Sequence, residues 1–117
     1  MDTTVYFNSR CSKCRTTQGI LEEHGIEADY VRYLEQAPAR AELERVMQLL
    51  GIDDPRQMMR TGEDAYRELG LAAADRDRLL DAMTEHPILI ERPIVIRGDR
   101  AVIARPPERV LDLLGDQ

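Results

Sequence analysis

Apolar and polar positions near the start of this 117-residue chain follow the period of a strand, then a helix, then a second strand. Residues 3–7, TTVYF, are rich in β-branched and aromatic side chains and predict a buried strand. Residues 15–24 place apolar side chains on one side of a helix that Gly25 ends. Residues 27–33, EADYVRY, alternate as a second strand. This order predicts a right-handed βαβ unit whose two strands are parallel.

The middle of the chain carries the apolar spacing of helices, interrupted by Gly51, Gly70 and Pro87. It predicts helical segments over residues 39–50, from Pro55 through Met59, over 63–69 and over 75–85. Farther on, the runs 94–96 and 101–103 flank Gly98-Asp99 and predict a hairpin. Pro106-Pro107 starts a last helix, for which we expect an apolar face made of Val110, Leu111 and Leu114.

Without its central helices, this order is that of a thioredoxin-like core. We therefore expect an α/β protein with a mixed four-stranded sheet and flanking helices. The helical segment, roughly residues 36–86, then forms an insertion. At 117 residues, the chain is expected to be one domain, residues 1–117.

Composition narrows the possible functions. Hydrophobic residues make up 43% of the chain and charged residues 32%, and the net charge is −6. This charge argues against direct nucleic-acid or anionic-membrane binding, and no apolar run approaches the ~20 residues that cross a bilayer. The start, MDTTVYF, lacks the basic region of a signal peptide. We expect a cytoplasmic protein, where a close cysteine pair is more often catalytic or metal-binding than structural.

Both cysteines lie in YFNSRCSKCRTT, residues 6–17. Cys11 sits where the first helix should begin, so the helix N-terminus favours its thiolate. The basic residues Arg10, Lys13 and Arg15 are expected to act in the same direction. Cys14 lies one turn deeper, where packing and a redox role both fit. A structural zinc site is disfavoured because the two histidines have the wrong spacing, and we expect no metal.

Five blocks in order give the chain a specific resemblance. They are YFNSRCSKCRTT, YLEQAP at 33–38, QMMRTGEDAYRELGL at 57–71, HPILIERPIVI at 86–96 and ARPPERVLDLL at 104–114. With these blocks the sequence resembles the glutaredoxin-coupled arsenate reductases, with the Spx-type regulators as close relatives. The family fold is a thioredoxin-like domain with a helical insertion, in agreement with the pattern of elements.

The resemblance implies roles for individual residues. Cys11 would attack arsenate, and the three arginines Arg60, Arg92 and Arg105 would hold the oxyanion. Asn8, Ser12 and Arg15 are expected to support the cysteine turn. Pro93 resembles the cis-proline of thioredoxin-like folds, which predicts a cis Arg92–Pro93 bond. The resemblance further implies glutathione as co-substrate, glutaredoxin or thioredoxin as reductant, and no bound cofactor. We expect a monomer.

Two positions depart from the family pattern. Phe7 stands where the best-known reductases carry a histidine before the asparagine of the turn. Cys14 stands where many members have a non-thiol residue, and it could attack the Cys11 adduct to form a disulfide. Two other functions therefore stay open. One is an Spx-type regulator that binds RNA polymerase through a Cys11–Cys14 switch, and the other is a general glutathione-linked thiol–disulfide oxidoreductase.

Overall fold

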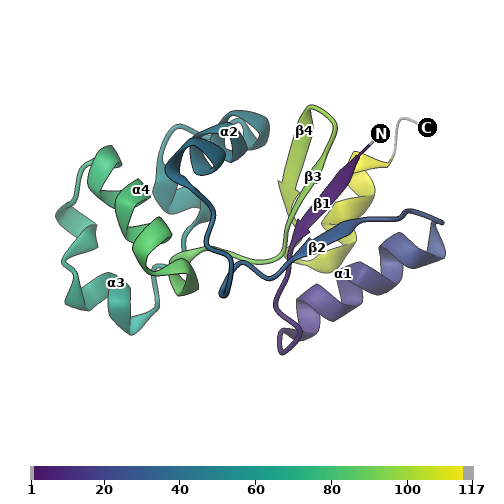
Figure 1. Ribbon diagram of the computed structural model, residues 1–117, viewed down its shortest axis with the longest axis horizontal. Helices are drawn as coiled ribbons and strands as arrows, with labels where there is room; N and C mark the ends of the chain where they lie inside the picture. The colour runs from purple at the N-terminus through teal and green to yellow at the C-terminus, as the bar shows by residue number, and fades with distance from the viewer. Residues whose placement is uncertain (1, 115–117) are drawn as a thin grey trace. The chain divides into compact units, whose positions relative to one another are not determined.

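A computed structural model describes residues 2–114 and divides the chain into two compact units. One unit holds the described residues of Met1–Tyr33 and Arg92–Gln117, and the other is Leu34–Glu91. Figure 1 shows the sheet within the first unit and helices within the second. The expected insertion over roughly 36–86 lies within the second unit, and its status as part of a single domain stays a prediction.

The first unit is built on a four-stranded sheet with the order β2-β1-β3-β4. The strands are β1 (Thr3–Tyr6), β2 (Asp29–Val31), β3 (Ile94–Arg97) and β4 (Arg100–Ile103). β1 pairs in parallel with β2 and antiparallel with β3, and β3 and β4 form an antiparallel hairpin. The mixed sheet, the parallel βαβ unit and the hairpin agree with the sequence-based expectations.

One face of this sheet carries the core of the first unit. Val5 on β1 pairs with Tyr30 and Val95, and Val95 pairs with Val102, so the four side chains form one row across the sheet. Helix α1 (Ser12–Glu23) and the 3₁₀ segment η4 (Pro107–Leu113) cover this row (Figure 1). The buried side chains that pack against this row include Leu21 of α1, Val110 of η4 and both cysteines. The cysteine turn is thus anchored directly on the core.

The second unit contains three α-helices and three short 3₁₀ segments. The helices are α2 (Arg40–Leu50), α3 (Asp64–Glu68) and α4 (Arg76–Glu85), and the 3₁₀ segments are η1 (Pro55–Met58), η2 (Leu71–Ala73) and η3 (Pro87–Leu89). α2 packs on α4 through buried apolar side chains such as Leu43, Met47 and Met83. Asp75 caps α4 by accepting a hydrogen bond from the Arg78 amide at 2.9 Å.

The C-terminal helix differs from the expectation. Residues 107–113 form a 3₁₀ helix instead of an α-helix. With three residues per turn, Pro107, Val110 and Leu113 share one side, and Val110 and Leu113 are buried. Leu111, expected on the apolar face, is 38% exposed. That part of the prediction is wrong because it applied the α-helical period to a 3₁₀ segment.

Across residues 2–114, every helix is too short or too polar to span a membrane.

Candidate active site

The cysteine turn between β1 and α1 is held by its own main chain. The Asn8 carbonyl accepts a hydrogen bond from the Cys11 amide at 3.0 Å, and the Asn8 side-chain oxygen accepts one from the Arg10 amide at 3.0 Å. Arg15 reaches back from α1 and donates to the Ser9 carbonyl at 2.7 Å. Ser12, also expected to support this turn, is exposed at the first helical position, and its main-chain carbonyl accepts a hydrogen bond from the Thr16 hydroxyl. Asn8 and Arg15 thus brace the turn that presents Cys11.

Cys11 is the N-cap of α1, with an extended backbone at φ −89° and ψ 119°. Its side chain makes no cap hydrogen bond, so the amides of the first helical turn act on the sulfur as oriented dipoles. Burial opposes ionisation of the thiol, but the Cys14 amide, the Cys14 thiol, the Arg92 guanidinium and the Lys13 amide together lower the pKa of Cys11. A lowered thiol pKa is the main requirement for a nucleophilic cysteine.

Cys14 behaves in the opposite way. It is 0% exposed within the core of the first unit, whereas Cys11 is 9% exposed. Burial, with the neighbouring Cys11 sulfur, raises the pKa of Cys14 to about 12. Both cysteines are free thiols. At neutral pH the pair is therefore asymmetric, with Cys11 the better thiolate and Cys14 a buried hydrogen-bond donor.

A charged side chain from outside the cysteine turn lowers the pKa of Cys11. Arg10 and Arg15 are exposed, and Arg15 is committed to the Ser9 carbonyl. The charged side chain that lowers the pKa of Cys11 is Arg92, more than 80 positions away in sequence. The expectation that Arg10, Lys13 and Arg15 also favour the thiolate stays a prediction, and the contribution of the helix N-terminus agrees with the lowered pKa of Cys11.

Arg92 and Arg105 are brought together in the first unit. Arg105 donates from Nη1 to the main-chain carbonyl of Arg92 at 3.0 Å, and both side chains are half-buried. Each precedes a proline. The Arg92–Pro93 bond, which the resemblance predicted to be cis, is cis in the structure, and so is Arg105–Pro106. Two of the three expected oxyanion ligands, Arg92 and Arg105, thus lie in the same unit as Cys11, and Arg92 acts on its thiol.

Arg60 lies in the second unit, immediately after η1. Its amide donates to the Leu89 carbonyl at 2.7 Å, next to an isolated bridge between Met59 and Ile90. Its guanidinium Nη2 lies 3.1 Å from Oε2 of Glu63. Glu63 was not among the residues expected at the site, although an acid three positions after Arg60, across Thr61-Gly62, is the spacing of a tight turn that can bring the two side chains together.

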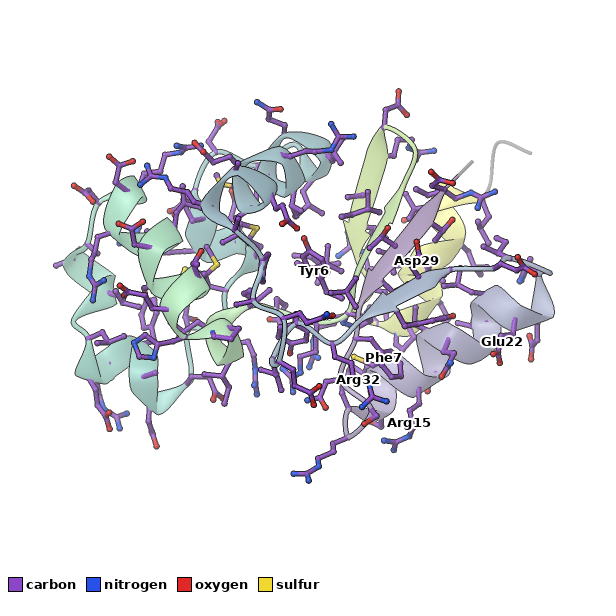
Figure 2. The ribbon with its side chains drawn as sticks, in the orientation of Figure 1. Tyr6, Phe7, Arg15, Glu22, Asp29 and Arg32 are labelled. Atoms are coloured by element: carbon purple, nitrogen blue, oxygen red, sulfur yellow. The ribbon has the colours of Figure 1, made fainter. Side chains whose placement is uncertain are left out.

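Phe7, at the position of the family histidine, is apolar and 9% exposed. Its ring meets that of Tyr30 edge-on, with centroids 5.2 Å apart and an interplanar angle of 74°. Figure 2 shows Phe7 on the side of the sheet that carries α1, with Arg15 and Arg32 at the same end of this unit. Burial and the nearby Glu22 raise the pKa of Tyr30. Aromatic packing therefore replaces an imidazole here, which leaves the helix N-terminus, Cys14 and Arg92 to activate Cys11.

Within residues 2–114, histidine, cysteine and acidic side chains do not gather in groups of three or more that could hold a metal ion. The chemistry that this arrangement offers is that of a single activated thiolate beside guanidinium groups. Such a combination suits nucleophilic attack on a multiply charged oxyanion, because the guanidinium charge offsets the repulsion between two anions.

The model of the ArsC family matches residues 6–113 of the chain. An arsenate reductase of Haemophilus influenzae is 47% identical over 116 residues, covering 97% of this chain and 100% of that protein. The solved structure of an arsenate reductase from Vibrio cholerae superposes with a TM-score of 0.93 at 46% identity, covering 96% of this chain and 97% of that one. This likeness supports the thioredoxin-like fold expected from the sequence.

A third relative carries no stated activity. The protein of Escherichia coli K12 called uncharacterized protein YfgD is 43% identical over 113 residues, covering 95% of each chain.

Proposed function

This chain belongs to the ArsC family, and we propose that it is a thiol-dependent arsenate reductase with Cys11 as its nucleophile. The observation that carries the proposal is the lowered pKa of Cys11 at the start of α1 beside Arg92. The substrate is drawn from the relatives that are named arsenate reductases. We propose Arg92 and Arg105, which lie in the same unit as Cys11, as oxyanion ligands, and we propose Arg60 of the second unit as a third ligand on the family resemblance alone.

The proposed reaction begins with attack of the Cys11 thiolate on the arsenic atom of arsenate. A sulfur–arsenic bond forms, and one arsenate oxygen leaves as water after protonation. Glutathione thiolate then attacks the Cys11 sulfur, so that the electron pair of the sulfur–arsenic bond passes to arsenic. Arsenic(V) is reduced to arsenic(III), arsenite departs, and Cys11 is left as a mixed disulfide with glutathione. Glutaredoxin returns Cys11 to the thiol by thiol–disulfide exchange.

The arginines have a defined part in this proposal. Arsenate is a tetrahedral, multiply charged anion, and a guanidinium fork can donate two parallel hydrogen bonds to its oxygens. The Arg105 hydrogen bond to the Arg92 carbonyl supports a preorganised pair, which avoids reorganisation when charge develops on the oxyanion. Such a site needs local and not overall positive charge, consistent with a chain whose net charge is −6.

The position of Cys14 favours glutathione over an internal disulfide. A thiol with a pKa near 12 and no exposed surface is a poor attacking group at neutral pH. In our proposal Cys14 therefore stays reduced during turnover and serves Cys11 as a hydrogen-bond donor. The same property weakens the case for a Cys11–Cys14 regulatory switch and for a general dithiol oxidoreductase. We further propose that the protein acts in the cytoplasm as a monomer.

The decisive experiment is arsenate-dependent turnover of the purified protein with glutathione, glutaredoxin, glutathione reductase and NADPH. Wild type should oxidise NADPH only when arsenate is present, and Cys11→Ser should abolish this activity. Omission of glutaredoxin, or its replacement by thioredoxin and thioredoxin reductase, identifies the reductant. Absence of arsenate-dependent turnover in wild type would refute the proposal. Copurification of RNA polymerase, with no turnover, would favour the regulator instead.

A further inference from the structure

The Arg60 guanidinium has a carboxylate partner in the second unit. Arg60 Nη2 lies 3.1 Å from Glu63 Oε2, and the two side chains are 26% and 25% exposed. Half-buried partners are less solvated than the exposed pairs on the same unit, so the carboxylate is a stronger competitor for the guanidinium. For comparison, the exposed pair Arg67–Asp64 has the same three-residue spacing and a distance of 3.0 Å, with side-chain exposures of 75% and 80%.

The main chain holds Glu63 against Arg60. The Glu63 amide donates to the Arg60 carbonyl at 3.1 Å, which closes a tight turn between the two residues. Glu63 is also the N-cap of α3, a position where an acidic side chain would ordinarily accept hydrogen bonds from helix amides. Its side chain makes no such cap bond. The carboxylate is therefore directed to Arg60 and not to the helix that it precedes.

Open space adjoins the Glu63 side chain. Glu63 lines a surface hollow of about 340 Å³, together with Thr61, Gly62, Tyr66 and Arg67. A carboxylate that leaves the guanidinium can therefore turn away without displacing packed side chains. Since the amide of Arg60 is fixed to the Leu89 carbonyl, the guanidinium can exchange one anionic partner for another while its backbone stays in place.

We propose that Glu63 is a specificity-determining residue that occupies the Arg60 guanidinium until an oxyanion replaces it. This inference rests on the proposed function, in which Arg60 is a ligand of arsenate. An anion with several charged oxygens can displace a single carboxylate more readily than a weakly charged anion can. Glu63 thus lowers the affinity of Arg60 for all anions, and it lowers it less for multiply charged tetrahedral oxyanions than for weakly charged ones.

The test compares Glu63→Gln with Glu63→Ser, in which serine can cap α3 and so protect the fold. Both variants should lower the KM for arsenate by roughly three- to tenfold, the effect of removing a competing ion pair of moderate strength. They should also lower the inhibition constant of phosphate to a similar extent, with a smaller change in kcat. Asp64→Asn, which removes the matched exposed pair with Arg67, should leave all three constants unchanged.

A second measurement separates this inference from the proposed function. Arsenate and phosphate binding is measured by calorimetry in a Cys11→Ser background, with and without Glu63→Gln. Tighter binding after Glu63→Gln would support the role of Glu63 even if wild type proved inactive as a reductase. An unchanged or higher KM, or unchanged or weaker anion binding, would overturn the inference while leaving arsenate turnover by wild type intact.

Discussion

The Nη1 atom of Arg105 donates a hydrogen bond of 3.0 Å to the main-chain carbonyl of Arg92. Arg105 follows β4, and Arg92 directly precedes the proline before β3, so this bond ties the two ends of the hairpin together. One donor of the Arg105 guanidinium thus fixes the position of this planar group relative to the main chain of Arg92. Because Arg92 also lowers the pKa of Cys11, the orientation of Arg105 is coupled to the residue that activates the thiol.

Arg105→Lys should therefore impair the enzyme even though it keeps the positive charge. A lysine ammonium cannot bond the Arg92 carbonyl and an oxyanion with the same fixed geometry. We expect kcat/KM for arsenate to fall by roughly tenfold or more, in line with the ~1.5–3 kcal/mol of a hydrogen bond to a charged group. Arg109→Lys, at an exposed arginine of η4, is the matched control and should retain wild-type kinetics. Equal kinetics for the Arg105 variant would show that charge alone suffices.

The pKa of Cys11 can be measured through its alkylation rate. An iodoacetamide titration should show the rate rising with pH with a midpoint below the ordinary thiol value of 9.0, because the lowered pKa populates the thiolate at lower pH. Arg92→Ala should shift the midpoint upward, since it removes the charged side chain that favours the thiolate. Arg10→Ala should leave it nearly unchanged. A larger shift with Arg10→Ala than with Arg92→Ala would contradict the assignment of the activating charge.

Cys14 can be tested as a donor separately from its capacity for redox chemistry. Cys14→Ser retains a hydroxyl donor, whereas Cys14→Ala removes the donor, so the alanine variant should raise the Cys11 midpoint relative to the serine variant. Glutathione-dependent turnover by Cys14→Ser should stay within about threefold of wild type at neutral pH. Accumulation of a Cys11–Cys14 disulfide during wild-type turnover, detected by mass spectrometry, would instead identify Cys14 as a resolving thiol.

Local patterns in the sequence were enough to predict the elements of the first unit. The β-branched runs at Thr3–Tyr6 and around Gly98 specify strands directly, since a buried strand needs such side chains. The position of Cys11 at the start of α1 was equally visible, because Gly25 ends the helix and the strand before it sets its beginning. These features depend on neighbours in sequence, and the structure reproduces them.

Long-range partners were not predictable in the same way. The activation of Cys11 by Arg92 and the bond from Arg105 to Arg92 join residues far apart in sequence, and charge patterns along the chain pointed instead to Arg10 and Arg15. Glu63 was overlooked because an acid near an arginine is common in so charged a chain. Resemblance to the family supplied the arginine positions, whereas the contacts that give them roles required the fold.

The 3₁₀ period of residues 107–113 gives a test of packing in the first unit. Leu113 is 7% exposed and shares the buried side with Val110, whereas Leu111 is 38% exposed. Leu113→Ala should lower the free energy of unfolding by roughly 2–4 kcal/mol, the range for a buried leucine, while Leu111→Ala should cost less than about 1 kcal/mol. Urea unfolding followed by circular dichroism measures both. An equal or larger loss of stability for Leu111→Ala would contradict the burial of Leu113 and the exposure of Leu111.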